Sequence, residues 1–322
     1  MTQHCSSTMT RRLMPMLACA LCAFVGPLLG GCTVNEATGE SRLAIGYLSR
    51  GQQIALGEEA MPQLTQEYGG SVPSPQINAY VSEVGFNMVP FTEGENPSLP
   101  WEFTLLDSPV INAFALPGGK VFMSRGLAEK MTSEAQLAGV LGHEIGHVTA
   151  EHVPERIQTS MGTSLLASVA SAAAGLGDSA ALQQLTDVVV GYGGQGYLLS
   201  FGRGQELEAD MLGMRYMTRA GYDPVGQRQV MEILAEASSG GRKPEFLSTH
   251  PHPESRIEQI DGLLSTEYAG ITGTNKVGQF EARFRDRFLT PIASVPAPQA
   301  SVEGERRGVT AFAWCGICNP AK

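Results

Sequence analysis

Basic residues and cysteines are both scarce in this sequence. Lysine and arginine together number 22 against 32 acidic residues, which gives a formal net charge of −10 at pH 7. No basic cluster follows a nucleic-acid-binding pattern, so we expect no nucleic-acid partner. The same shortage makes electrostatic attraction to an anionic membrane surface unfavourable, so any attachment to a membrane needs another cause.

Half of the six cysteines lie in an N-terminal segment that we expect to be removed: Cys5, Cys19 and Cys22. Apart from Cys32, this leaves only Cys315 and Cys318, which form a C-G-I-C motif. Two thiols are too few for a structural zinc site with four ligands. We interpret the pair as structural, such as a short disulfide, or incidental; a redox pair and an accessory metal site are the alternatives.

The N-terminus is typical of a bacterial lipoprotein leader. Arg11 and Arg12 precede the apolar run 13–31, which contains two prolines and is short for a membrane-spanning helix. The run ends in L-G-G-C, which resembles a lipobox whose cysteine, Cys32, receives the lipid that supplies the anchoring energy. A plain signal peptide and an uncleaved anchor are the alternatives. Thr33 stands where an aspartate would indicate inner-membrane retention, so we predict a lipid-anchored protein of the outer membrane that faces the periplasm.

The motif with the clearest chemistry is H-E-x-x-H, formed by His143, Glu144 and His147. Residues four apart in a helix differ by about 40° in direction and about 6 Å in height, so both imidazoles lean toward one point. This spacing suits two corners of a zinc tetrahedron. Glu144 stands where a general base takes a proton from metal-bound water. The alternative is two ordinary histidines on a half-buried helix.

Local signals place this motif on a helix. Ser133 and Gln136 have the S-x-x-Q form of a capping box, and Glu134 puts negative charge in the first turn. An apolar stripe follows at helical spacing: Leu137, Leu141, Ile145 and Val148. Three glycines lower the helix propensity, and we expect them to let another backbone approach closely: Gly139, Gly142 and Gly146.

A second segment, QELEADMLGMRY at 205–216, supplies carboxylates at helical spacing. Glu206 and Asp210 are four apart and share one face, which is costly to bury unless a cation compensates. Glu206 is the candidate third zinc ligand, and Asp210 is the candidate acceptor for the outer N–H of a ligating histidine. We expect Glu208 to be solvated or paired with an arginine. The alternative is a plain acidic helix face.

A third segment, STHPHPESRI at 248–257, brings two more histidines. Pro251 and Pro253 keep His250 and His252 out of a helix interior, and a new helix is expected near Pro253. Arg256 either pairs with a carboxylate, steadies an oxyanion or is a surface charge.

The coarse fold prediction is α+β and mainly α-helical. Residues 51–89 are predicted to be mostly helix, and 101–123 to form strands that include a hairpin around Pro117-Gly118-Gly119-Lys120. Such a strand either accepts an extended peptide or belongs to an ordinary sheet. Residues 161–190 are interpreted as a buried helical pair or a mobile cover, and the glycine-rich 191–204 as a loop.

The predicted domain organisation has five parts. Residues 1–31 are the signal peptide, 32–50 a tether, 51–265 the main domain, 266–290 a C-terminal helical segment and 291–322 a disordered tail with the cysteine pair. No 34-residue repeat follows residue 265.

Taken together, H-E-x-x-H at 143–147, E-x-E-A-D at 206–210 and T-H-P at 249–251 resemble gluzincin zinc metallopeptidases of the CAAX-protease, HtpX and Oma type. Within these, the segments VNEATGE and NAFALPGGKVF are most similar to periplasmic BepA-like peptidases. The resemblance implies a zincin-like domain with a small antiparallel sheet beside the H-E-x-x-H helix.

The resemblance also implies the site residues and the function. One Zn²⁺ per chain would be held by His143, His147 and Glu206, with Glu144 and Asp210 catalytic, His250 a fourth ligand or latency switch, and Arg203 and Arg256 in support. We expect a metalloendopeptidase, a hydrolase that cleaves misfolded or stalled envelope proteins in protein quality control. The alternative is a chaperone-like or scaffolding outer-membrane lipoprotein whose zinc site is largely latent.

Overall fold

The computed structural model describes residues 32–43, 47–159, 186, 200–239 and 244–298. The predicted signal peptide, most of 161–199 and the Cys315–Cys318 pair therefore lie outside the described residues. Within the described part of the chain, no helix combines the length and the apolar character that a membrane crossing requires.

The predicted tether contains a folded hairpin. Strand β1 (Cys32–Val34) pairs antiparallel with β2 (Ser41–Leu43). The buried Asn35 in the turn donates from Nδ2 to the carbonyl of Thr149, at 2.9 Å. This bond ties the hairpin to the end of the helix that carries H-E-x-x-H, so the segment is docked against the domain at that point.

Two helices follow close to their predicted positions. Helix α2 (Arg50–Glu67) begins at a capping box in which Ser49 and Gln52 bond each other's backbone, and it ends before Gly69, whose φ is +87°. Helix α3 (Pro75–Met88) starts with proline in its first turn, where the missing N–H costs no hydrogen bond. Two short 3-10 turns, η1 (Val89–Phe91) and η2 (Asn96–Ser98), lead to the sheet.

The sheet has three strands in the order β3-β5-β4: β3 (Glu102–Leu106), β4 (Ala113–Leu116) and β5 (Lys120–Ser124). The predicted hairpin is confirmed, because β4 and β5 are antiparallel around Pro117–Gly119. The prediction of an antiparallel sheet is wrong for the remaining pair, since β3 runs parallel to β5. The sheet is therefore mixed. The central strand β5 runs antiparallel to its hairpin partner β4, and β3 pairs with the other edge of β5.

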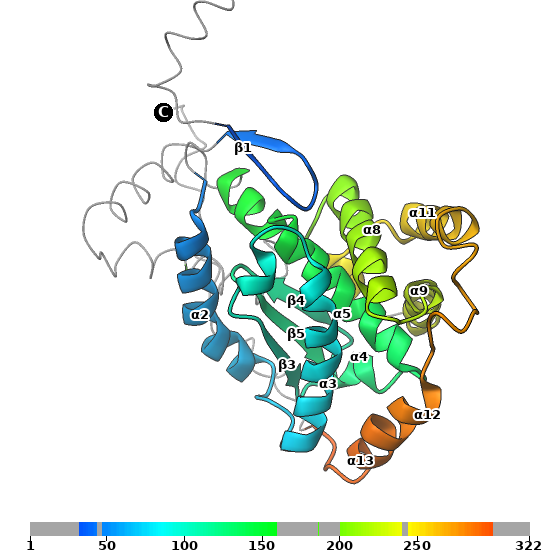
Figure 1. Cartoon of the computed structure of the whole chain (residues 1–322). Coiled ribbons are helices and arrows are strands. Elements are labelled where there is room, and N and C mark those ends of the chain that lie inside the picture. Colours follow the sequence, from blue (N-terminus) through cyan, green and yellow to red (C-terminus); the bar gives the residue numbers. More distant parts are fainter. Residues whose placement is uncertain (1–31, 44–46, 160–185, 187–199, 240–243, 299–322) are drawn as a thin grey trace, which may run out of the picture.

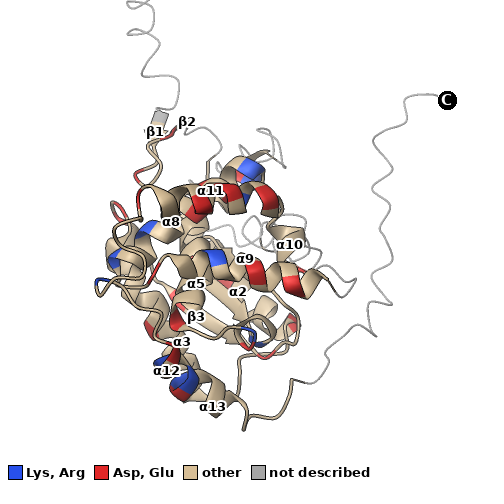
Figure 2. Ribbon diagram, turned by 90° about the vertical axis from the view of Figure 1, so that its right-hand side faces the viewer, with Lys and Arg blue, Asp and Glu red and all other residues tan. Residues whose placement is uncertain are grey.

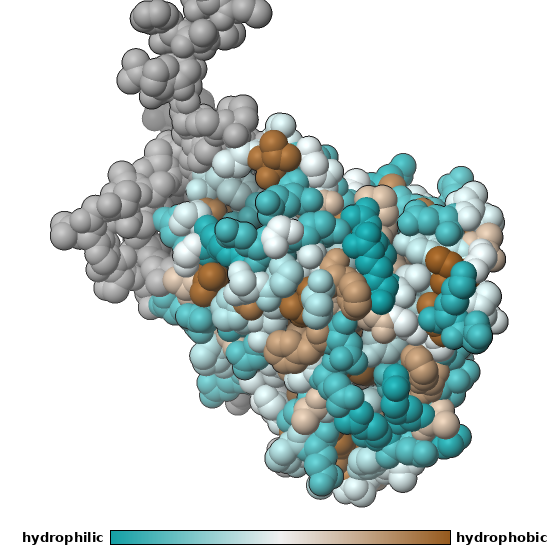
Figure 3. Space-filling model, viewed as in Figure 1, coloured by the Kyte–Doolittle hydropathy of each residue, from teal (hydrophilic) through white to brown (hydrophobic). Residues whose placement is uncertain are grey.

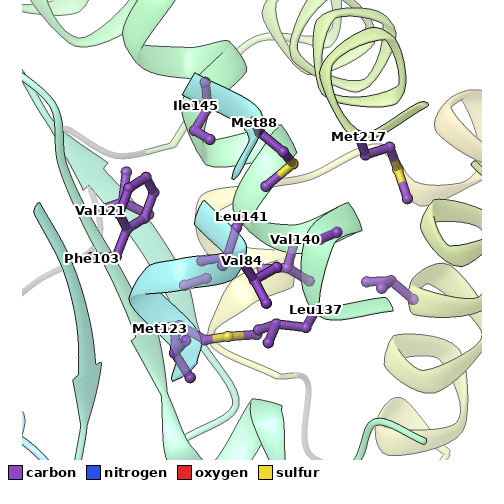
Figure 4. Packing of buried hydrophobic residues seen from close by; sticks show 14 of the residues in the cluster. Val84, Met88, Phe103, Val121, Met123, Leu137, Val140, Leu141, Ile145 and Met217 are labelled. Atoms are coloured by element: carbon purple, nitrogen blue, oxygen red, sulfur yellow. The ribbon is translucent and has the colours of Figure 1, made fainter. Parts of the chain in front are cut away.

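The main core lies between the sheet and the helices α3 and α5 (Glu134–Thr149), which follows the short helix α4 (Arg125–Ala128). Every residue of α5 is buried, so this helix forms the centre of the domain. Figure 4 shows buried apolar side chains of this cluster, among them Val84, Met88, Phe103, Val121, Met123, Leu137, Leu141, Ile145 and Met217. A smaller cluster under α2 contains Leu56, Phe114 and Phe122.

Further helices cover the other side of α5: α8 (Arg203–Arg219), α9 (Val225–Ser238), the short α10 (Phe246–Thr249) and α11 (Pro253–Ser265). Figure 1 shows α8, α9 and α11 beyond α5, on the side away from the sheet. The outer face of α11 is acidic, with Glu254, Glu258 and Asp261 exposed, while its Arg256 is buried. Acidic residues are visible along this helix in Figure 2.

The predicted C-terminal helical segment is only partly helical. Turns occupy most of 266–278, and a single helical stretch is then formed by α12 (Glu281–Phe284), the π-helical turn η3 (Arg285–Leu289) and α13 (Thr290–Ile292). The start of the predicted tail packs on the domain, because the buried Arg125 donates to the carbonyls of Ile292, Val295 and Pro296. The face seen in Figure 3 is mostly hydrophilic, with apolar residues in small separate spots.

Candidate metal centre

The helix α5 begins as predicted at Ser133, whose hydroxyl accepts from the N–H of Gln136 at 3.3 Å. The second half of the capping box differs from the prediction. The Gln136 side chain accepts from the N–H of Thr132 at 2.7 Å, one residue before the cap. Both bonds still satisfy free N–H groups at this helix start, so H-E-x-x-H lies on a well-capped helix.

Glycines let α8 pack directly on α5, as predicted. A Cβ on Gly146 would lie 2.7 Å from the carbonyl oxygen of Ala209, and one on Gly142 would lie 3.0 Å from that of Gly213. A Cβ on Gly213 would in turn lie 2.7 Å from the backbone nitrogen of His143. Real Cβ atoms essentially never come within 3.0 Å of such atoms, so this backbone-to-backbone contact requires glycine at 146 and 213, and a side chain at 142 would be tight. The contact brings the acidic face of α8 over the two histidines.

The structure brings together four buried side chains from three segments: His143, His147, Glu206 and His250. Each offers one nitrogen or oxygen atom, and these atoms all lie within 4.8 Å of one another. The Nε2 atoms of His143 and His147 face each other at 3.0 Å, and the Glu206 oxygens lie 3.6 and 3.5 Å from them. All four side chains are at most 1% exposed.

This group fits a zinc ion. Two nitrogens bound to one tetrahedral zinc lie about 3.3 Å apart, close to the separation of the two Nε2 atoms. Oε1 of Glu206 and Nε2 of His250 are buried without a hydrogen-bond partner, which is costly unless a cation binds them, whereas Oε2 of Glu206 lies 2.9 Å from the Arg256 guanidinium. The donor set of imidazoles and a carboxylate is the one that zinc prefers.

Glu144 lies beside the group and does not belong to it. Both of its carboxylate oxygens are buried without a hydrogen-bond partner, and Oε1 lies 3.5 Å from Nε2 of His250. Burial raises the pKa of Glu144 to about 8. A cation bound at the adjacent group would lower this pKa toward neutral, where a carboxyl group exchanges protons readily.

Burial also keeps the candidate ligand imidazoles uncharged. It lowers the pKa of His143 to about 4, with the Arg256 guanidinium adding to the effect. It lowers the pKa of His147 well below the ordinary value, and neighbouring His143 lowers it further. Both rings are therefore neutral at pH 7, the form that binds a metal. Burial raises the pKa of Glu206 well above its usual range in the metal-free protein.

Behind His143 lies a fully buried network that we call the Asp210 arm, made up of His143, Asp210, Arg256 and Gln227. His143 Nδ1 lies 2.8 Å from Oδ1 of Asp210, which also accepts from Gln227 Nε2 at 2.7 Å. Arg256 binds both Asp210 oxygens at 2.7 Å. Burial alone would raise the pKa of Asp210, but Arg256 and His143 hold it below its usual value.

Arg256 therefore pairs with carboxylates, one of its three predicted roles. Besides Asp210, its Nη1 lies 2.9 Å from Oε2 of Glu206, an ion pair whose angles do not make a hydrogen bond. Both carboxylates raise the pKa of this guanidinium, although burial opposes them. Arg203 is different: its side chain is exposed in the first turn of α8, and no described bond joins it to the group.

Behind His147 lies a second network, the His152 arm, made up of His147, His152 and Glu208. His147 Nδ1 lies 2.8 Å from Nδ1 of His152, and His152 Nε2 lies 3.0 Å from Oε2 of Glu208. Glu208 was predicted to be solvated or paired with an arginine; its side chain is partly exposed, at 21%, and its partner is His152 rather than an arginine. No sequence pattern indicated a role for His152, although it lies only five residues beyond His147.

The segment that carries His250 closes over the group. The Phe246 ring stacks on the His250 ring at a centroid distance of 4.3 Å, and the His250 N–H donates to the Phe246 carbonyl. Phe201 stacks on His147 at 3.9 Å, and its N–H donates to the carbonyl of Thr249. As a result, neither Glu144 nor the four-residue group is open to solvent in this structure.

Comparison with known proteins agrees with this geometry. A model of the family described as Peptidase family M48 matches residues 75–264. The "Beta-barrel assembly-enhancing protease" of Escherichia coli (strain K12) is 34% identical over 224 residues, which are 65% of this chain and 43% of that protein. The "Mitochondrial metalloendopeptidase OMA1" of Schizosaccharomyces pombe is 33% identical over 213 residues, which are 65% of this chain and 60% of that protein. The chain thus spans about half the length of these relatives.

Proposed function

The chain belongs to peptidase family M48, and on that premise we propose that it is a zinc-dependent endopeptidase with one Zn²⁺ per chain. The observation that carries the proposal is the buried group of His143, His147 and Glu206 with the unpartnered Glu144 carboxylate beside it. Glu144 in this position has no structural bond to maintain, which favours a chemical role.

In the proposed mechanism, His143, His147 and Glu206 would hold the metal. Such a metal would supply Lewis acidity at the site, lowering the pKa of a water toward about 7 and polarising the substrate carbonyl. Glu144 takes the proton from the attacking water and returns it to the leaving amine. Asp210 fixes the ring of His143 through Nδ1, and Arg256 keeps Asp210 ionised. Glu206, Glu144 and Asp210 thus each have a single role.

The segment that carries His250, which we call the closed segment, covers the site and would hold it inactive. With His250 beside Glu144 and the rings of Phe246 and Phe201 over the histidines, no peptide reaches the group. The start of the segment is held by Glu245, whose Oε1 accepts from Tyr68 at 2.5 Å and from Asn112 at 3.0 Å. We propose that this conformation is latent and that His250 leaves when substrate binds.

Strand β4 is the proposed docking edge for substrate. It is an edge strand of the β3-β5-β4 sheet, and it packs against α5, which carries H-E-x-x-H. All four residues of β4 are buried in this closed structure, so the edge must be uncovered before a peptide binds. An extended peptide that pairs with β4 would run along α5 and bring its backbone near Glu144.

The proposed substrates are misfolded or stalled envelope proteins, in a periplasmic quality-control role. The name of the Escherichia coli relative, which refers to β-barrel assembly, supports this setting. Attachment through lipid on Cys32 is a separate proposal, supported by the L-G-G-C motif. Expression in labelled palmitate tests it: the wild type is expected to incorporate label and Cys32→Ala to lose it, while label retained in Cys32→Ala would contradict the anchor.

Glu144→Gln tests the peptidase proposal. The variant keeps the shape of the side chain but removes the base, so cleavage of an unfolded protein such as casein is expected to fall by about 10²- to 10⁴-fold. Glu232→Gln, an exposed change on α9, is the matched control and should cleave at the wild-type rate. Full cleavage by Glu144→Gln would refute the mechanism.

The burial of His250 in the group favours a second candidate, a chaperone-like or scaffolding protein with a largely latent zinc site. The same variant separates the two functions in cells. If Glu144→Gln restores envelope function fully in a deletion strain, the binding role dominates; if it restores none, proteolysis is the function.

A further inference from the structure

A second imidazole lies behind His147, on the side that faces away from the metal group. His147 Nδ1 lies 2.8 Å from Nδ1 of His152, and His152 Nε2 lies 3.0 Å from Oε2 of Glu208. His152 is 1% exposed, and the side chain of Glu208 is 21% exposed. The proposed mechanism uses neither residue, yet a buried imidazole between a ligand and a carboxylate is too specific to be ordinary packing.

The chain makes a particular turn to place His152 there. On a continuous helix, a residue five positions after His147 would point about 140° away from it. Instead α5 ends at Thr149, Glu151 adopts a left-handed conformation with φ of 57°, and a new helical stretch begins at His152. A left-handed conformation is unfavourable for a residue other than glycine. Here it changes the direction of the chain, so that the His152 ring lies next to Nδ1 of His147.

Only one arrangement of hydrogens makes both bonds when Nε2 of His147 serves a metal. Nδ1 of His147 must carry the ring hydrogen and donate it to Nδ1 of His152. His152 then carries its own hydrogen on Nε2 and donates it to Glu208. The carboxylate thereby selects the tautomer of His152 that is able to accept from His147.

We propose that His152 and Glu208 are positioning residues that fix the ring orientation and tautomer of His147 for metal binding. The inference rests on the proposed zinc site and adds residues to it. It gives His147 an outer support that corresponds to Asp210 behind His143. Loss of such an outer partner usually weakens metal affinity by about 10- to 100-fold.

Zinc affinity of the purified protein tests the proposal, measured by competition with a chromogenic chelator. The variants are His152→Leu, Glu208→Ala and the double change. We expect His152→Leu to weaken zinc binding about 10- to 100-fold and Glu208→Ala to weaken it less. Because Glu208 acts through His152, the double variant should bind zinc no more weakly than His152→Leu. The visible spectrum of the Co²⁺-loaded variants should also differ from that of the wild type.

His252→Asn is the matched control, because asparagine tolerates the left-handed φ of 65° at that position and His252 makes no described contact with His147. It should bind zinc like the wild type. Wild-type affinity in both His152→Leu and Glu208→Ala would overturn the inference, as would losses that simply add in the double variant. If His152→Leu does not fold, Glu208→Ala decides alone. A wild type that binds no zinc would instead refute the proposed function.

Discussion

The two imidazoles that face each other in the metal group are supported from behind in different ways. In the Asp210 arm, every side chain behind His143 is fully buried, and an aspartate is balanced by the guanidinium of Arg256. In the His152 arm, the imidazole of His152 lies between His147 and Glu208, and Glu208 is partly exposed to solvent. One ligand histidine is therefore held by a buried, charge-balanced network, whereas the other is held by a hydrogen-bonded chain that ends at a partly exposed carboxylate.

The largest effect is expected from Asp210→Ala, which breaks the buried arm. The change leaves the guanidinium of Arg256 with a single carboxylate partner in a fully buried position. Removing one member of a buried ion pair typically costs about 3–5 kcal/mol, so the free energy of unfolding of the metal-free protein should fall by that amount in urea titrations. Asp261→Ala removes an exposed ion pair on α11 and should cost less than about 1 kcal/mol. Equal losses would contradict the account.

Gly213→Ala should have the next largest effect, because it pushes α8 away from His143. The new methyl group would meet the backbone of α5 at 2.7 Å, so the helices must shift. Overpacking of this kind costs about 1–3 kcal/mol, and thermal melts followed by circular dichroism would measure it. Gly204→Ala lies on the same helix with nothing within 4 Å, and it should leave stability unchanged or slightly higher. A Gly213→Ala protein as stable as Gly204→Ala would show that close backbone contact is unnecessary.

His250→Ala removes the imidazole that lies beside both His143 and His147, the histidines that the two arms support from behind. If the closed segment holds the site latent, loss of His250 frees Glu144 and should raise the rate of casein cleavage several-fold. Ser248→Ala, an exposed change in the same short helix, should leave the rate unaltered. No increase in His250→Ala would remove the latency proposal and leave the peptidase proposal standing.

The smallest effect on stability is expected from Glu208→Ala. Because this carboxylate is partly solvated, its loss should cost the metal-free protein less than about 1 kcal/mol. The same urea titration measures it beside Asp210→Ala. A loss as large as that of Asp210→Ala would mean that both arms carry buried charge and that the comparison fails.

Spacing in the sequence predicted part of the Asp210 arm, namely that Asp210 supports a ligand histidine, but it did not predict Gln227. His143 and His147, and likewise Glu206 and Asp210, repeat at the period of a helix, and the glycines of α5 indicated a close neighbour. That neighbour is α8. Two helices approach as closely as α5 and α8 only where glycines stand at the crossing, because a larger side chain would keep the backbones apart. Family resemblance then linked His250 and Arg256 to the same site.

The His152 arm could not be predicted in this way. Its geometry depends on the left-handed conformation of Glu151, a residue whose type gives no sign of it. A helix continued through 152 would have pointed the imidazole away. The parallel pairing of β3 with β5 was missed for a related reason, because alternation marks strands but does not order them. The His152 arm and the β3–β5 pairing both depend on the direction that the chain takes after a turn, which residue type alone does not show.

Zinc analysis of the purified protein tests the central claim most directly, with the wild type and His143→Ala compared after the same preparation. The account predicts one zinc ion per wild-type chain and almost none in His143→Ala. A wild type without zinc, or a His143→Ala protein that keeps it, would contradict the claim that three distant segments meet around one metal ion.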